Sequence, residues 1–162
     1  MSHSTSLNTT LDYLNLFHPC HGVLVVGSGN GSLVDLIASW NVEDVVLAEA
    51  DEKQNERMKK FHTIPKAWKL INALVYKDQM DCEYYRTSNP AVDSIEHPEK
   101  LGNVWPNLHI DSVEHRESIS IPTLLLQAEV KNINWLIIDC TPALKLLQEA
   151  VSTLHRCDVV VA

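Results

Sequence analysis

A short apolar run that ends in a cluster of glycines constrains this sequence more than any other feature. Residues 22–27 read Gly-Val-Leu-Val-Val-Gly, and two more glycines follow at positions 29 and 31. A continuous apolar run of this length is typical of a strand that is buried on both faces in a parallel sheet. We therefore expect a strand, followed by a tight turn whose glycines let a ligand approach main-chain N–H groups closely.

Helical and strand-like patterns alternate after the glycines. Residues 32–40 predict an amphipathic helix and residues 45–50 predict a second buried strand, which completes a βαβ unit with a right-handed crossover. The expected fold class is α/β, with a mostly parallel sheet covered by helices on both sides in three layers. The same criteria predict a leading helix over 7–17, helices over 52–61, 122–129 and 143–155, and strands over 68–76, 81–86, 134–140 and 158–162.

Composition limits the range of partners. The chain has 162 residues, enough for one globular domain spanning 1–162, and its net charge of -8 leaves no basic surface for nucleic acid. No segment approaches the ~20 apolar residues that a membrane span needs. The four cysteines are scattered without a C-x-x-C pair, which favours reduced thiols and a cytoplasmic protein. We expect no metal site, because His18, Cys20 and His21 lack a second ligand pair at zinc spacing.

One long region interrupts the alternation of helices and strands. Residues 87–118 are polar and contain three prolines and a glycine that break any periodicity, so we expect a long surface excursion there. His109 and His115 lie in this region and are candidates for a general base, but single histidines in polar loops are usually solvated. We therefore assign neither histidine a catalytic role.

The glycine spacing and one acidic residue indicate a cofactor. Gly27, Gly29 and Gly31 form G-x-G-x-G between a strand and a helix, whereas a nicotinamide dinucleotide fingerprint needs a third small residue where Ser32 stands. The spacing resembles motif I of S-adenosylmethionine-dependent methyltransferases. Glu49 ends the second strand about 20 residues later, where an acid accepts protons from both ribose hydroxyls. Together these features indicate a cofactor that contains adenosine.

Further segments resemble the FkbM family of methyltransferases. AEADEKQNERMKK resembles the family's E-P-x-P-x-N phrase, with Glu49 and Asn55 at its polar positions. The segment NALV from Asn72 resembles the family's N-x-A-hydrophobic stretch, and CEYYRTSNPAVDSI resembles its following strand and turn. NINWLIIDCTPALKLLQEA resembles l-K-I-D-x-E-G-x-E-x-x-x-L-x-G, with Asp139 at the strand-end aspartate. The resemblance covers most of residues 22–150.

This resemblance implies a Rossmann-like methyltransferase fold that binds S-adenosylmethionine. The family's sheet continues beyond a fifth strand, so we interpret the chain as a fold that lacks the last strands. Its final strand would then leave an open edge for a second copy or a partner chain. The residues implied to bind the cofactor are Gly27, Ser28 and Gly29 at the methionine portion, Gly31 in the same loop, Glu49 at the ribose, Ala50 and Asp51 beside the adenine, and Asn72 and Ala73 at its edge.

The function predicted from these features is S-adenosylmethionine-dependent methyl transfer to a small-molecule hydroxyl. Asp139, at the end of the fourth buried strand, is the candidate catalytic residue. It would face the donor methyl or orient the acceptor. The alternative is that Asp139 caps the following helix. Thr141 and Pro142 replace the family's Glu-Gly, which keeps open a methyltransferase-like binding or interaction module without turnover. A nicotinamide-dependent oxidoreductase is a third alternative, disfavoured by the glycine spacing and the absence of a Tyr-x-x-x-Lys pair.

Overall fold

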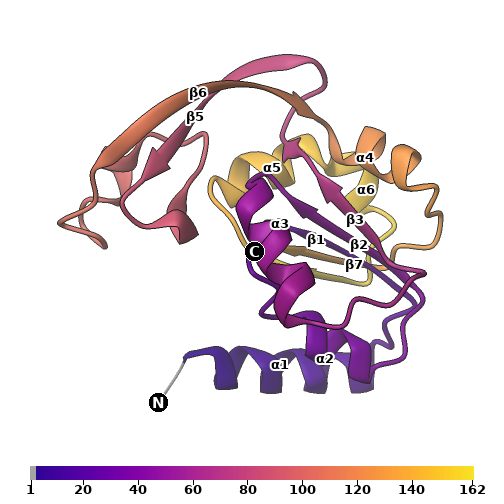
Figure 1. The fold of residues 1–162 in the computed structure, drawn as a ribbon. Coiled ribbons are helices and arrows are strands. Elements are labelled where there is room, and N and C mark those ends of the chain that lie inside the picture. The colour runs from indigo at the N-terminus through magenta and orange to yellow at the C-terminus, as the bar shows by residue number, and fades with distance from the viewer. Residues whose placement is uncertain (1–2) are drawn as a thin grey trace.

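A five-stranded parallel sheet forms the centre of the structure, a computed structural model that describes residues 3–162 (Figure 1). The strand order is β3-β2-β1-β7-β8. The chain therefore adds β2 and β3 on one side of β1 and later adds β7 and β8 on the other side. The predicted α/β protein with a mostly parallel sheet is confirmed. The strands are β1 (Gly22–Val26), β2 (Asp44–Glu49), β3 (Lys69–Asn72), β7 (Trp135–Ile138) and β8 (Val159–Val161).

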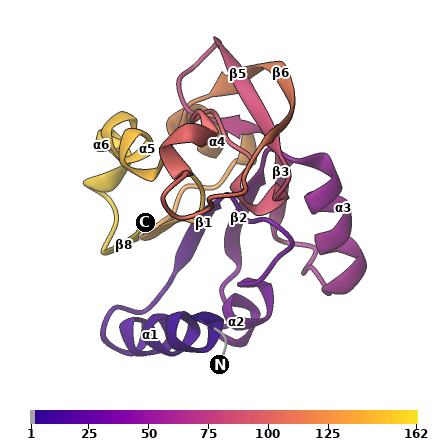
Figure 2. The same ribbon diagram turned by 90° about the vertical axis from the view of Figure 1, so that its left-hand side faces the viewer.

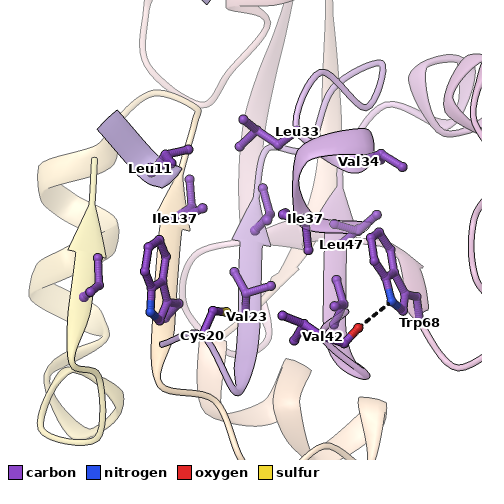
Figure 3. Close-up of a cluster of buried hydrophobic side chains, with 14 of the residues drawn as sticks. Leu11, Cys20, Val23, Leu33, Val34, Ile37, Val42, Leu47, Trp68 and Ile137 are labelled. Carbon is purple, nitrogen blue, oxygen red and sulfur yellow. Dashed lines mark hydrogen bonds between the residues drawn. The ribbon is translucent and has the colours of Figure 1, made fainter. Parts of the chain in front are cut away.

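Helices cover both faces of this sheet (Figure 2). The residues of β1 alternate between two buried clusters: Val23 and Val25 face α1, α2 and α3, whereas Leu24 and Val26 face α4 and α5. Figure 3 shows the first cluster, in which the indole N–H of Trp68 donates to the Val42 carbonyl oxygen at 3.1 Å. The helices are α1 (His3–Phe17), α2 (Val34–Ser39), α3 (Glu52–Phe61), α4 (Ile121–Ala128), α5 (Ala143–Glu149) and α6 (Val151–Leu154).

A second, mixed sheet arches away from the first (Figure 1). Its order is β4-β6-β5, with β4 parallel and β5 antiparallel to β6. Two short 3-10 helices, η1 (Pro90–Val92) and η2 (Pro98–Leu101), lie between β5 and β6. The strands are β4 (Leu74–Val75), β5 (Met80–Thr87) and β6 (Ile110–Ile119).

The structure corrects the predicted extent of three elements. Residues 68–76 do not form one strand, because the chain leaves the parallel sheet after β3 and enters the second sheet as β4. The predicted helix 143–155 is divided at Ala150 into α5 and α6. The predicted excursion 87–118 contains most of β6, which sequence periodicity does not reveal because both faces of that strand are largely polar. Among residues 3–162, no helix is long and apolar enough to cross a bilayer.

One partly buried cation links the second sheet to the first. The Arg86 guanidinium on β5 lies 3.1 Å from an Asp51 carboxylate oxygen after β2, 3.3 Å from Asp93 and 2.8 Å from Glu114 on β6. The side chains of Asp51 and Asp93 are only 7% and 4% exposed, so Arg86 supplies the countercharge for two buried carboxylates. Such a pair contributes little when intact compared with a well-packed apolar alternative, but breaking it leaves uncompensated buried charge.

Replacing Arg86 should therefore destabilise the protein strongly. We expect Arg86→Met to lower the free energy of unfolding by about 3 kcal/mol, because Asp51 and Asp93 lose their common partner. Urea unfolding monitored by circular dichroism measures this change. Arg57→Met is the matched control, since Arg57 is exposed on α3 and should change stability by less than about 0.5 kcal/mol. Equal stability of the two variants would contradict the structural role of Arg86.

Candidate functional site

A cavity of about 290 Å³ lies at the carboxyl ends of the central strands. Between β1 and β7 the strand order reverses, and ligands of open parallel sheets bind at such a place. The segment after β5 covers the far side of the cavity and is tied to α5 by an ion pair of 3.1 Å between Glu96 and Lys145. The lining includes Gly27, Ser28, Gly29, Asn30, Ser32, Glu49, Ala50, Ala73, Tyr84, Asp93, Ser94, Ile95, Asp139, Cys140, Thr141 and Pro142.

A second hollow, of about 740 Å³, lies between α4 and α6. Its walls include Leu125, Leu126, Val130 and Arg156. These residues precede β7 and β8, so this hollow is at the amino ends of the strands. The cavity at the carboxyl ends is therefore the candidate functional site.

The backbone N–H groups of the glycine turn after β1 point toward β2. Gly27 and Ser28 donate their backbone N–H groups to the Ala48 carbonyl oxygen at 2.9 and 3.1 Å, and Gly29 donates to the Glu49 carboxylate at 2.7 Å. All three N–H groups therefore already have partners within the protein. The turn depends on positive φ angles of 78° at Gly27, 54° at Gly29 and 90° at Gly31.

The three glycines serve different purposes. A Cβ atom at position 27 would lie 2.5 Å from the Cys140 Cβ, and one at position 31 would lie 2.7 Å from the Met58 Cγ, whereas one at position 29 would meet no atom within 4 Å. Gly27 thus allows β1 to approach the loop after β7, and Gly31 allows α3 to pack against the turn. Of the predicted cofactor-binding glycines, Gly27 and Gly29 line the cavity and Gly31 does not.

Glu49 connects the two turns that form one end of the cavity. Its carboxylate accepts one hydrogen bond from the Gly29 N–H and one from the Asp51 N–H, both of 2.7 Å. Burial raises the pKa of this carboxyl above its ordinary value of 4.5, and the two N–H donors oppose that shift. Each carboxylate oxygen keeps a further lone pair, so Glu49 can accept hydrogen bonds from a ligand while it holds the turns.

The residues predicted beside an adenine divide into two groups. Ala50 and Ala73 line the cavity, whereas Asp51 and Asn72 do not. Asp51 accepts a hydrogen bond from the Lys53 N–H at the start of α3 and pairs with Arg86. Asn72 donates to the carbonyl oxygens of Glu49 and Ala50 at 3.0 and 3.2 Å. Asp51 and Asn72 therefore position the turn after β2.

Asp139 lies at the opposite end of the cavity, in the loop between β7 and α5. The alternative interpretation of Asp139 as a helix cap is wrong, because α5 begins after Pro142 without a side-chain cap. Although Asp139 is solvent-accessible, partial desolvation raises the pKa of its carboxyl above 3.8. His109, directly before β6, and His115, on β6, are exposed and do not line the cavity.

Sequence patterns missed the part of the cavity that the second sheet supplies. The buried Tyr84 ring lies 5.1 Å from the guanidinium groups of both Arg86 and Arg116, and Asp93 lies beside it. Pairing of β5 with β6 positions Tyr84, and the segment after η1 positions Asp93; no local pattern marks either arrangement. Thr141 was also missed, although its place two residues after Asp139 was a usable signal.

The cavity is strongly acidic. Three carboxylates, those of Glu49, Asp93 and Asp139, line it, and none of its lining residues within the described chain is Lys, Arg or His. Among residues 3–162 no group of three or more His, Cys, Asp or Glu side chains is arranged to hold a metal ion, and the four cysteines are free thiols. The potential inside the cavity therefore favours a neutral or cationic ligand.

The fold and the site define a class of protein: an α/β protein with a five-stranded parallel sheet and an acidic cavity at its strand order reversal. The chain matches no protein-family model, no curated protein and no solved structure. The FkbM resemblance therefore stays a prediction.

Alanine substitutions at two glycines test the geometry of the turn. We expect Gly29→Ala to cost about 1 kcal/mol, the ordinary penalty for a side chain at positive φ, because its Cβ meets open space. Gly27→Ala should cost about 3 kcal/mol, since a steric overlap with the loop after β7 adds to that penalty. Chemical denaturation measures both values. A Gly27 variant as stable as the Gly29 variant would show that β1 and this loop are not in close contact.

Proposed function

We propose that the chain is an S-adenosylmethionine-dependent methyltransferase that acts on a hydroxyl group of a small molecule. The observation that carries this proposal is the acidic cavity formed by the glycine turn and Glu49. The order β3-β2-β1-β7-β8, with a glycine turn after the first strand and an acid at the end of the second, supports the Rossmann-like arrangement that binds adenosine cofactors. The free thiols fit the cytoplasm.

The charge of the cavity favours this cofactor over a nicotinamide dinucleotide. A dinucleotide brings a pyrophosphate with two negative charges, which needs N–H groups or cations to receive it. In this site Gly27, Ser28 and Gly29 already donate their N–H groups to β2, and three carboxylates line the wall. S-adenosylmethionine carries a sulfonium cation and no phosphate, so its charge suits the site.

The residues of the chain would contribute binding and alignment. When bound, S-adenosylmethionine supplies the reactive methyl group, so the protein needs few chemically obligatory side chains. Glu49 would accept hydrogen bonds from the ribose hydroxyls, and Ala50 with Ala73 would leave a flat apolar surface for the adenine. The segment bearing Asp93, Ser94 and Ile95 would exclude water from one side.

Calorimetric titration with S-adenosylhomocysteine tests the binding step. The wild-type chain should bind this product analogue with a micromolar dissociation constant and should give no measurable binding of NAD. Glu49→Gln should weaken binding at least about tenfold, because an amide provides a donor where a charged acceptor is needed. Glu117→Gln, an exposed site on β6, is the control. Binding of NAD in place of S-adenosylhomocysteine would reject the proposal.

The affinity should also depend on pH in a defined direction. Because burial raises the pKa of the Glu49 carboxyl above 4.5, acid protonates it in the folded protein before it would protonate an exposed glutamate. Affinity for S-adenosylhomocysteine should therefore fall as the pH drops through that raised pKa, with a midpoint above 4.5. Protonation of this group favours the folded state, so the loss would not come from unfolding driven by Glu49. Glu49→Gln should remove this dependence.

Turnover distinguishes catalysis from binding alone. Thr141 and Pro142 stand where the FkbM pattern has Glu-Gly, which favours the alternative of a binding module without activity. Conversion of S-adenosylmethionine to S-adenosylhomocysteine in the presence of hydroxylated small molecules would exclude that alternative. Binding of the cofactor without conversion across such a panel would favour it.

A further inference from the structure

A buried hydroxyl group of the second sheet has no hydrogen-bond partner within the described chain. The Tyr84 side chain on β5 lines the cavity and is 3% exposed, and its hydroxyl makes no hydrogen bond with any of residues 3–162. In this part of the chain, the unpaired polar side-chain atoms that are closed to solvent belong to Asn55, Arg116 and Thr141. The Tyr84 hydroxyl is not among them, so it opens into the cavity. Because an unpaired buried hydroxyl is costly, it is suited to a ligand that accepts a hydrogen bond from it.

Packing fixes the direction of this hydroxyl. The Tyr84 ring lies 5.1 Å from the Arg86 guanidinium and 5.1 Å from the Arg116 guanidinium. It also packs with Ala50, after β2, and with Ile95, in the segment that covers the cavity. A ring that is already held in this way has little freedom left to lose when a ligand binds.

The charges around Tyr84 define what its hydroxyl can bind. Burial raises the pKa of Tyr84 above its ordinary value of 10.0, and the charges of Glu49 and Asp93 raise it further. Arg86 and Arg116 only partly oppose this rise in the pKa. The hydroxyl therefore keeps its proton and acts as a hydrogen-bond donor at neutral pH. A ligand group that faces it must accept a hydrogen bond, and the two carboxylates favour an uncharged acceptor over an anion.

Glu49 and Tyr84 reach the cavity from different sheets. Glu49 ends β2 of the parallel sheet, whereas Tyr84 belongs to β5 of the second sheet. The charge of Glu49 acts on the Tyr84 hydroxyl, so the two groups lie near each other. A ligand that is bound at Glu49 is therefore within reach of Tyr84 and can contact both sheets at once.

We propose that the Tyr84 hydroxyl donates a hydrogen bond to the uncharged nucleoside part of the bound ligand, and that the ligand thereby bridges the two sheets. This inference rests on the proposed function and goes beyond it, because it gives the second sheet a binding role that the FkbM resemblance does not assign. A nucleoside offers ribose oxygens and adenine ring nitrogens, which accept hydrogen bonds and carry no charge. Occupation of the site then holds the second sheet more firmly against the first.

Paired calorimetric titrations with S-adenosylhomocysteine and adenosine test this contact. Tyr84→Phe should weaken the binding of both ligands by the same factor, about fivefold, because one hydrogen bond is lost. Tyr85→Phe is the matched control, since the Tyr85 hydroxyl donates to Glu83 at 2.6 Å and Tyr85 does not line the cavity. This control should keep both wild-type dissociation constants. Weaker binding of S-adenosylhomocysteine alone would place the contact at the amino-acid part of the ligand and would overturn the proposal.

The melting temperature of the ligand-free protein separates binding from folding. Tyr84→Phe keeps the ring and removes an oxygen that has no partner in the described chain, so the melting temperature should stay equal or rise. A purely structural role for the hydroxyl would instead lower the melting temperature and leave both dissociation constants unchanged.

Hydrogen–deuterium exchange tests the bridge between the sheets. At saturating S-adenosylhomocysteine, the amides of β5 and β6 in the wild-type chain should exchange more slowly than in the ligand-free chain. Tyr84→Phe, also saturated with ligand, should lose most of this protection, whereas Tyr85→Phe should keep it. Equal protection in the two variants would show that the ligand does not bridge the sheets.

The outcomes separate this inference from the proposed function. If S-adenosylhomocysteine binds and Tyr84→Phe behaves as Tyr85→Phe does, the role of Tyr84 is wrong and the cofactor assignment stands. If the folded wild-type chain binds neither ligand, the proposed function fails and this inference fails with it.

Discussion

The two hydrogen bonds that the Glu49 carboxylate accepts hold together both sides of the candidate site. One comes from Gly29 in the turn after β1, and the other comes from Asp51 in the turn after β2. A single buried charge thereby fixes two loops that follow neighbouring strands. Burial raises the pKa of the Glu49 carboxyl, and the two charge-assisted hydrogen bonds partly offset this effect.

Arg86 extends this arrangement to the second sheet. It pairs with Asp51, the residue that also donates its N–H to Glu49, and with Asp93 in the segment that covers the cavity. The cover is thus joined to the strand ends by a partly buried ionic cluster, and also by a small apolar cluster that contains Ala50, Tyr84 and Ile95. Arg86 is paired with carboxylates within this cluster and does not itself line the cavity, so the lining of the cavity remains acidic.

The parallel sheet and one end of the site could be predicted from the sequence because their signals are local. Residues 22–27 are apolar without interruption, and the glycine turn and Glu49 follow in the order that a βαβ unit requires. β6 could not be predicted in this way, since its inward-facing side chains include Glu114 and Arg116 rather than apolar residues. Tyr84 reaches the cavity through the pairing of β5 with β6, and Asp93 through its contacts with Arg86 and Thr87. Periodicity encodes neither of these. The supporting roles of Asp51 and Asn72 likewise depend on side-chain contacts that spacing alone does not define.

The most direct test of the account is a map of amide signals by nuclear magnetic resonance during titration with S-adenosylhomocysteine. The account predicts chemical-shift changes at residues 27–32, 49–51 and 139–141, which surround the acidic cavity, and unchanged signals at Leu125 and Arg156 between α4 and α6. Unchanged signals around the glycine turn at saturating ligand would contradict it. Changes concentrated between α4 and α6 would contradict it equally, because they would place the ligand at the opposite ends of the strands.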